Sequence, residues 1–228
     1  MAEEQSDVYR GSCHCGALQF TAEKKGTPEK VIECNCSYCS RTGFQYGSSL
    51  PVGEVKMTSN WDKYIDYQFG EKKYTHRFCS TCGSSIAVLN ADGKIATVNA
   101  RMMMADIKPR SLPVKVYNGA VEQKGYDPEP PKAPEPQPDG KLLYHGSCHC
   151  RAVTYEVIFP PITSVNQCGC SICWRLLSGE ESLFKYQFNT MKASHMTCKA
   201  CGVSLFNFLY PESPLAPLNG LISTLAFI

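Results

Sequence analysis

Gly11–Cys15 reads GSCHC, and Gly146–Cys150 repeats the same five residues. Each copy begins two residues after a tyrosine, in YRGSCHC and in YHGSCHC. Two cysteines separated by one residue point to the same side of an extended strand, so both sulfurs can reach one ion. An unusual pattern that occurs twice indicates that a larger unit is duplicated, so the two halves of the chain should share one fold.

Working outward from the two copies, each half of the chain contains seven cysteines in the order C-x-C, C-x-C-x-x-C and C-x-x-C. The first half has Cys13, Cys15, Cys34, Cys36, Cys39, Cys79 and Cys82, and the second has Cys148, Cys150, Cys168, Cys170, Cys173, Cys198 and Cys201. A YQF tripeptide begins twelve residues before the last pair in both halves, and a glycine directly follows that pair. The sequence therefore predicts two units of one kind.

A proline-rich segment, DPEPPKAPEPQPDG (Asp127–Gly140), separates the two halves and contains six prolines. Segments of this composition favour an extended polyproline II conformation and act as semi-rigid spacers. We predict a first domain over residues 1–122, a linker over residues 123–141 and a second, shortened domain over residues 142–228. The second and third cysteine groups are 40 residues apart in the first half and 25 in the second, which is where the shortening falls.

Both units are predicted to be mainly β. Ala17–Glu23 and Ala152–Phe159 are rich in strand-forming residues and directly follow the first cysteine pair of each half. Ser85–Ala100 has Asp92-Gly93 at its middle, which predicts a hairpin turn. Lys63–Phe78 is typical of two strands around a glycine. No segment predicts a long amphipathic helix, so the cores are small, and metal ions commonly stabilise domains of this kind.

Composition narrows the class of function. The 228 residues carry a net charge of +2, with 43% hydrophobic and 19% charged side chains. A near-neutral chain is a poor nucleic-acid binder, and no apolar run approaches the roughly 20 residues of a membrane span. The polar N-terminus does not resemble a secretory signal. We therefore expect a cytoplasmic protein that acts on a small molecule, without nucleic-acid or membrane partners.

Fourteen cysteines in a reducing compartment favour metal binding over disulfides. An even count also allows a disulfide framework, but neighbours one or two residues apart chelate an ion more easily than they form an unstrained bond. Iron–sulfur ligation also uses thiolates, although the spacing here differs from that of ferredoxins. Zinc is the metal that this pattern predicts.

Seven cysteines per unit divide into four and three. A structural zinc site has four ligands, whereas a catalytic site has three protein ligands and an open position. The compact C-x-C-x-x-C group can bind one ion from a single loop, while the two distant pairs can share another. The predicted tetrads are Cys13, Cys15, Cys79 and Cys82, and Cys148, Cys150, Cys198 and Cys201. The predicted triads are Cys34, Cys36 and Cys39, and Cys168, Cys170 and Cys173.

A histidine could instead close each triad into an inert site with three cysteines and one histidine. The candidates are His14, His76, His149 and His195. Each lies within or just before a tetrad pair, so we interpret it as a neighbour of the tetrad. The closed site stays an alternative.

Three motifs, GSCHCGA from Gly11, CNCSYCSR from Cys34 and HRFCSTCG from His76, resemble the glutathione-dependent formaldehyde-activating enzyme family, which includes the centromere protein V type. GSCHC, CGCSICWR and HMTCKACG repeat the resemblance in the second half. The resemblance implies a small all-β domain, the β-tent, with two zinc ions, and so up to four per chain. It also implies a structural role for Cys13, Cys15, Cys79 and Cys82 and a catalytic role for Cys34, Cys36 and Cys39.

The activity that this resemblance implies is a carbon–sulfur lyase reaction that joins glutathione to formaldehyde, giving S-(hydroxymethyl)glutathione, or that cleaves a related adduct. Glutathione carries two carboxylates, so Arg41, two residues past the first triad, is a candidate substrate contact. The first unit is expected to do the chemistry, because it keeps a longer segment, with Phe44, Tyr46 and Trp61, to enclose the substrate. The alternative is a zinc-stabilised binding module without turnover.

Overall fold

The structure is a computed structural model that describes residues 7–24, 28–59, 61–103, 111–127, 129, 132–163, 171–172, 174–188, 191, 193–209 and 216–217. The chain divides into two compact units, Met1–Asp127 and Pro128–Ile228, and the division falls inside the predicted linker. Both units are mainly β, as the sequence predicts. Among the described residues, no helix is long and apolar enough to cross a membrane.

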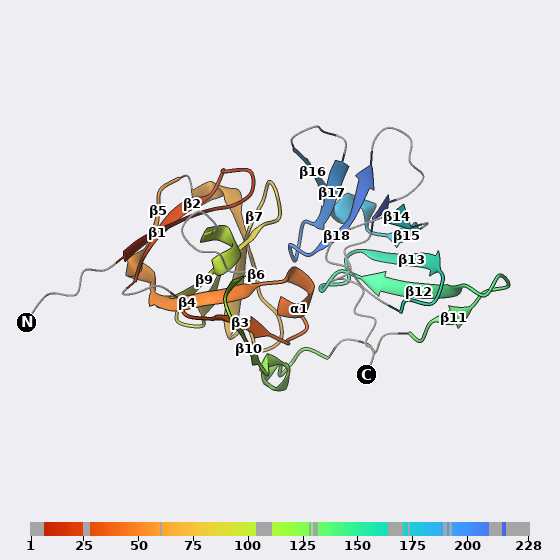
Figure 1. Ribbon diagram of the computed structural model, residues 1–228, viewed down its shortest axis with the longest axis horizontal. Coiled ribbons are helices and arrows are strands. Elements are labelled where there is room, and N and C mark those ends of the chain that lie inside the picture. Colours follow the sequence, from red (N-terminus) through yellow and green to blue (C-terminus); the bar gives the residue numbers. More distant parts are fainter. Residues whose placement is uncertain are drawn as a thin grey trace, which may run out of the picture. The chain divides into compact units, whose positions relative to one another are not determined.

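The first unit contains a three-stranded sheet in the order β1-β2-β5 and a seven-stranded sheet in the order β10-β3-β4-β9-β8-β7-β6 (Figure 1). The strands are β1 (Asp7–Ser12), β2 (Gln19–Lys24), β3 (Val31–Cys34), β4 (Gln45–Pro51), β5 (Val55–Met57), β6 (Tyr64–Tyr67), β7 (Tyr74–Cys79), β8 (Ser85–Asn90), β9 (Ile95–Asn99) and β10 (Val114–Tyr117). The predicted hairpin over Ser85–Ala100 is β8–β9, and the predicted pair of strands over Lys63–Phe78 is β6–β7.

The two faces of the seven-stranded sheet have different roles. Successive side chains of a strand point to opposite faces, whereas cross-strand partners share one face. The partners Ala87 and Val98 belong to the main core, together with Phe20 of the three-stranded sheet. The next partners along, Val88 and Thr97, line a cavity on the opposite face. The strand pairing therefore places a packed core on one face and a cavity on the other.

The short helices of the first unit are α1 (Cys39–Thr42) and the 3-10 turns η1 (Val52–Glu54), η2 (Trp61–Lys63), η3 (Ala100–Met103) and η5 (Gly119–Glu122). Helix α1 ends at Gly43, whose φ of 62° is left-handed. A glycine is suited to this position because it has no Cβ to oppose that conformation. No helix in the described parts of the chain is longer than four residues, as the sequence predicts.

In the second unit, the sheets have the orders β11-β12-β13-β15, β14-β19 and β16-β17-β18. The strands are β11 (Glu135–Pro136), β12 (Leu142–Ser147), β13 (Thr154–Phe159), β14 (Ser171–Ile172), β15 (Trp174–Ser178), β16 (Leu183–Gln187), β17 (Ala193–Cys198), β18 (Ser204–Leu209) and β19 (Ala216–Pro217), with the 3-10 turn η6 (Glu180–Ser182). Strand β11 pairs with β12, so part of the predicted linker is an edge strand of this unit rather than a free spacer.

The glycine that opens each GSCHC motif lies beneath an aromatic ring. Gly11 pairs across the strands with Phe20, and Gly146 pairs with Tyr155. A Cβ on Gly11 would stand 2.2 Å from the Phe20 ring, and one on Gly146 would stand 2.1 Å from the Tyr155 ring. Both rings are buried, so the glycine is required by close packing.

Candidate metal centres and an adjoining cavity

The first predicted tetrad joins two hairpins that are far apart in the sequence. Cys13 and Cys15 follow β1, whereas Cys79 ends β7 and Cys82 lies in the turn before β8. The Sγ atoms of Cys13 and Cys15 are 3.4 Å apart, and those of Cys15 and Cys79 are 3.8 Å apart. All four Sγ atoms lie within 4.8 Å of one another. An ion held here would tie the three-stranded sheet to the seven-stranded one.

The second tetrad has the same arrangement. Cys148 and Cys150 follow β12, Cys198 ends β17, and Cys201 lies in the turn before β18. The Sγ atom of Cys150 is 3.5 Å from that of Cys148 and 3.6 Å from that of Cys198. All four Sγ atoms again lie within 4.8 Å of one another.

Both tetrads fit a tetrahedral metal ion. Thiolates about 2.3 Å from such an ion lie about 3.8 Å apart, whereas a disulfide brings two sulfurs to about 2.05 Å. The observed spacings match the first value, and the cysteines are free thiols. The Leu18 N–H points at Cys13 Sγ at 3.2 Å, and the Thr81 N–H points at Cys79 Sγ at 3.4 Å. Such N–H groups stabilise thiolate ligands.

The first predicted triad also assembles in the structure, from a loop between β3 and α1. Cys34 ends β3, Cys36 lies in the loop and Cys39 begins α1. Their Sγ atoms lie within 4.8 Å of one another. Among the described residues, no further His, Cys, Asp or Glu side chain belongs to this group. The arrangement can hold a metal ion with three ligands and leaves one position for another molecule.

Backbone and side-chain donors surround the triad sulfurs. The Cys36 N–H donates to Cys34 Sγ at 3.4 Å, and the Cys39 N–H donates to Cys36 Sγ at 3.3 Å. The Tyr46 hydroxyl lies 3.2 Å from Cys39 Sγ. These contacts fix the positions of the three sulfurs.

The three thiols also shift one another's ionisation. Hydrogen bonds from Cys36 and Cys39 lower the pKa of Cys34 to about 3, against the effect of burial. Hydrogen bonding with Cys34 raises the pKa of Cys36, and hydrogen bonds with Cys34 and Cys36 raise that of Cys39. Cys34 is therefore the triad thiol that loses its proton most readily, and a thiolate favours the capture of a cation.

The turn η5 covers the triad from a distant part of the sequence. A Cβ on Gly119 would stand 2.3 Å from Cys34 Sγ, so the absence of a side chain lets the backbone approach the sulfur. The Gly119 backbone also hydrogen bonds to Cys34 and lowers its pKa. One turn later, Gln123 Oε1 accepts a hydrogen bond of 2.6 Å from the Ser37 N–H. Strand β10, which leads into this turn, pairs in parallel with β3.

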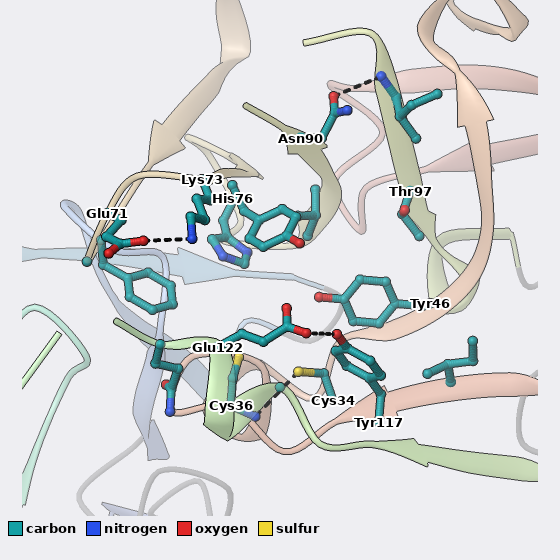
Figure 2. A pocket seen from close by; sticks show the side chains of 18 of the residues that line it. Cys34, Cys36, Tyr46, Glu71, Lys73, His76, Asn90, Thr97, Tyr117 and Glu122 are labelled. Carbon is teal, nitrogen blue, oxygen red and sulfur yellow. Dashed lines mark hydrogen bonds and ion pairs between the residues drawn. The ribbon is translucent and has the colours of Figure 1, made fainter. Parts of the chain in front are cut away.

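A cavity of about 380 Å³ adjoins the triad, and all of its lining residues belong to the first unit. Cys34 and Cys36 form part of its wall, with Tyr46 beside them and His76 on the facing side (Figure 2). Strand pairing aligns His76 with Val88, the cross-strand partner of Thr97. The cavity thus lies against the face of the sheet that is turned away from the main core.

Four exposed charged residues complete the lining, and we call them the charged wall: Glu71, Lys73, Glu122 and Lys124. Lys73 Nζ lies 2.7 Å from Glu71 Oε2. The Tyr117 hydroxyl donates to Glu122, and this bond raises the pKa of Tyr117 to about 12. The cavity therefore offers charges of both signs beside the sulfurs.

The other predicted site residues have varied positions. Arg41 donates from Nη1 to the Ser37 carbonyl at 2.5 Å, so it holds the triad loop, and its contact with substrate stays a prediction. Tyr46 lines the cavity, and Phe44 packs against it with ring centroids 4.7 Å apart. The side chain of Trp61 and the second triad, Cys168, Cys170 and Cys173, lie outside the described part of the chain.

His76 corrects one interpretation from the sequence. Its position three residues before Cys79 suggested a neighbour of the tetrad, whereas it lines the cavity of the triad. Side chains of a strand alternate, so an odd separation does not place two residues on one face. Burial lowers the pKa of His76 to about 4, with an opposing effect from Cys34.

These features define a mainly β domain with a cysteine tetrad and a cysteine triad beside a cavity. Residues 8–117 match the model of the family described as "Glutathione-dependent formaldehyde-activating enzyme". The match contains the first tetrad and the first triad, and it supports placing this segment of the chain in that family. A crystal structure of a Rhodobacter sphaeroides protein is 25% identical, with an alignment over 46% of this chain and 99% of the other and a TM-score of 0.41.

Proposed function

We propose that the first unit is a zinc-dependent carbon–sulfur lyase that forms or cleaves the C–S bond of glutathione or of a glutathione adduct. The observation that supports this most directly is the position of Cys34 and Cys36 on the wall of a cavity. Each tetrad, by contrast, has four sulfurs and needs no further ligand. Three ligands beside an accessible space are typical of catalytic zinc.

In this proposal, Cys34, Cys36 and Cys39 hold the zinc ion. When bound, zinc supplies a positive charge that favours the thiolate form of an incoming sulfur at neutral pH, and three thiolate ligands suit it to a soft sulfur substrate. The chain keeps the three ligands in position through the N–H groups of Cys36 and Cys39 and the hydroxyl of Tyr46.

The charged wall suits the ends of glutathione. This tripeptide has two carboxylates and one ammonium group at neutral pH. In this proposal, Lys73 and Lys124 contact the carboxylates, and Glu71 and Glu122 contact the ammonium group, while Lys73 gives up its ion pair with Glu71 and Glu122 its hydrogen bond from Tyr117. Exposed ion pairs contribute little each, about 0 to 1 kcal/mol, so these residues would act mainly on selectivity.

We propose that the second unit is a shortened domain of the same family with a structural role. Strands β12 and β13 and strands β16–β18 surround its tetrad in the way that β1, β2 and β6–β8 surround the first. The chain would then bind up to four zinc ions, two per unit. Two or fewer ions per metal-replete chain in elemental analysis contradicts this partition.

Turnover and thiol binding test the proposed activity together. Glutathione and labelled formaldehyde interconvert with S-(hydroxymethyl)glutathione, and NMR measures the rate of this exchange. The zinc-loaded chain is expected to accelerate it. After cobalt replaces zinc, glutathione is expected to shift the sulfur-to-metal charge-transfer band. Cys36→Ser should abolish both effects, while Cys170→Ser serves as the matched control in the second unit. Full metal content with neither effect in the native chain would indicate a binding module without turnover.

A further inference from the structure

His76 is held rigidly on the wall that faces the triad. Its ring stacks on Phe69 at a centroid distance of 5.5 Å and packs against Tyr38 at 4.2 Å. Tyr38 lies between Cys36 and Cys39 in the sequence, so one ring of the triad loop contacts the imidazole directly. Packed aromatic pairs of this kind hold a side chain in one orientation.

This imidazole also has unused hydrogen-bonding capacity. His76 is 5% exposed, and Nδ1 has no hydrogen-bond partner among the described residues. An unpaired buried polar atom costs roughly 1–3 kcal/mol, and such atoms occur where they have a role. Four other titratable groups of the lining have partners, since Lys73 pairs with Glu71 and Tyr117 with Glu122. Nδ1 itself is enclosed by the protein, so a ligand meets this imidazole at the part of the ring that lines the cavity.

We propose that His76 is a catalytic residue that carries the proton exchanged between the glutathione sulfur and the oxygen of the carbon substrate. This role rests on the function proposed above. The neutral imidazole accepts the proton of the thiol. The sulfur then forms a bond to the formaldehyde carbon, the π pair of the C=O bond moves to oxygen, and that oxygen takes the proton from the imidazolium. Cleavage follows the same path in reverse, with no other reactant.

The surroundings favour this cycle in both of its states. Burial keeps the free imidazole neutral, because the pKa of His76 is lowered to about 4. A proton on the ring is attracted by the negative charge at Cys34, which acts in the opposite direction on the same pKa. Formation of a substrate thiolate nearby adds a second negative charge and stabilises the imidazolium further. Proton transfer by a placed histidine contributes typically 10²–10⁴-fold to a rate.

The test compares the zinc-loaded native chain with His76→Gln and His76→Phe. His195→Gln is the matched control, because His195 stacks on Phe188 at 5.1 Å in the second unit as His76 does on Phe69. Glutathione binding is followed by calorimetry at pH 7 in two buffers of different ionisation enthalpy, which gives the number of protons released. Turnover is measured by the NMR exchange assay, and zinc content and circular dichroism monitor the fold.

We expect the native chain and His195→Gln to bind glutathione with little proton release. Both His76 variants should release about one proton per glutathione and lose at least about 100-fold in turnover. If the imidazole had only a structural role, the phenylalanine ring could fulfil it. Native turnover or native proton release in His76→Phe therefore overturns the proposal. If the native chain neither binds glutathione nor turns over, the proposed function itself fails, and this role fails with it.

Discussion

Replacing Gly119 with alanine tests whether η5 forms the cover of the triad. The new Cβ would stand 2.3 Å from Cys34 Sγ and 3.5 Å from Cys36 Cβ. Ordinary contact between such atoms is roughly 3.5 Å, so the sulfur or the turn must move by about 1 Å. Metal sites tolerate displacements of about 0.2 Å in their ligand distances. The substitution therefore disturbs the triad while leaving both tetrads in place.

The expected effect is a loss of about 10- to 100-fold in the affinity of the triad for zinc, as for other residues that support metal ligands. This loss corresponds to about 1.4–2.7 kcal/mol. Competition with a chromophoric chelator measures it, and the tetrads should keep their ions under the same conditions. Gly53→Ala is the matched control, because a Cβ at Gly53 meets no atom within 4 Å. Equal zinc affinities in the two variants would refute the close approach of η5 to Cys34.

Three further predictions concern stability and the division of roles. Arg151 has a left-handed φ of 62° at the position where the first unit has Gly16, with a φ of 75°. Arg151→Gly should therefore stabilise the second unit by about 1 kcal/mol in urea unfolding, and Gly16→Arg should destabilise the first. A loss of stability in Arg151→Gly contradicts this prediction, since the exposed ion pair that Arg151 forms stabilises the unit by less than this strain costs. Cys79→Ser should unfold the first unit because structural zinc contributes directly to folding, whereas Cys36→Ser should abolish turnover with most of the fold kept; identical thermal melting of the two variants would remove the distinction between tetrad and triad. The unfolded chain binds a proton at His76 near pH 6.5, but the folded chain does so only near pH 4. The free energy of unfolding therefore falls as the pH decreases between these values, by about 3 kcal/mol at most. His76→Phe should flatten this part of the profile of stability against pH, and an unchanged slope would show that the histidine is not buried.

The cysteines made much of the fold predictable. Their order indicated which sulfurs meet, because C-x-C on a strand and C-x-x-C in a turn restrict the directions in which side chains can point. The Asp92-Gly93 turn predicted the β8–β9 hairpin, which the structure confirms. These are local signals, and they depend on few residues at fixed spacing.

The cavity was not predictable from the same signals. Gly119 reaches the triad and Lys124 lines the cavity because β10 pairs in parallel with β3, a contact between segments more than 80 residues apart. Nothing in the sequence near Cys34 indicates that pairing. His76 was misplaced for a related reason, since proximity along a strand to Cys79 says little about the face on which a side chain lies. Long-range strand order, rather than local pattern, decides which residues line the cavity.

The late position of η5 also sets an order of assembly during synthesis. Cys82, the last ligand of the first tetrad, leaves the ribosome 37 residues before Gly119. At 5–20 residues per second this delay is about 2–7 s. The nascent first tetrad can therefore take its ion while the triad is still uncovered. The triad cysteines leave earlier still, so both sets of sulfurs are complete in the growing chain before the backbone of η5 can close over Cys34.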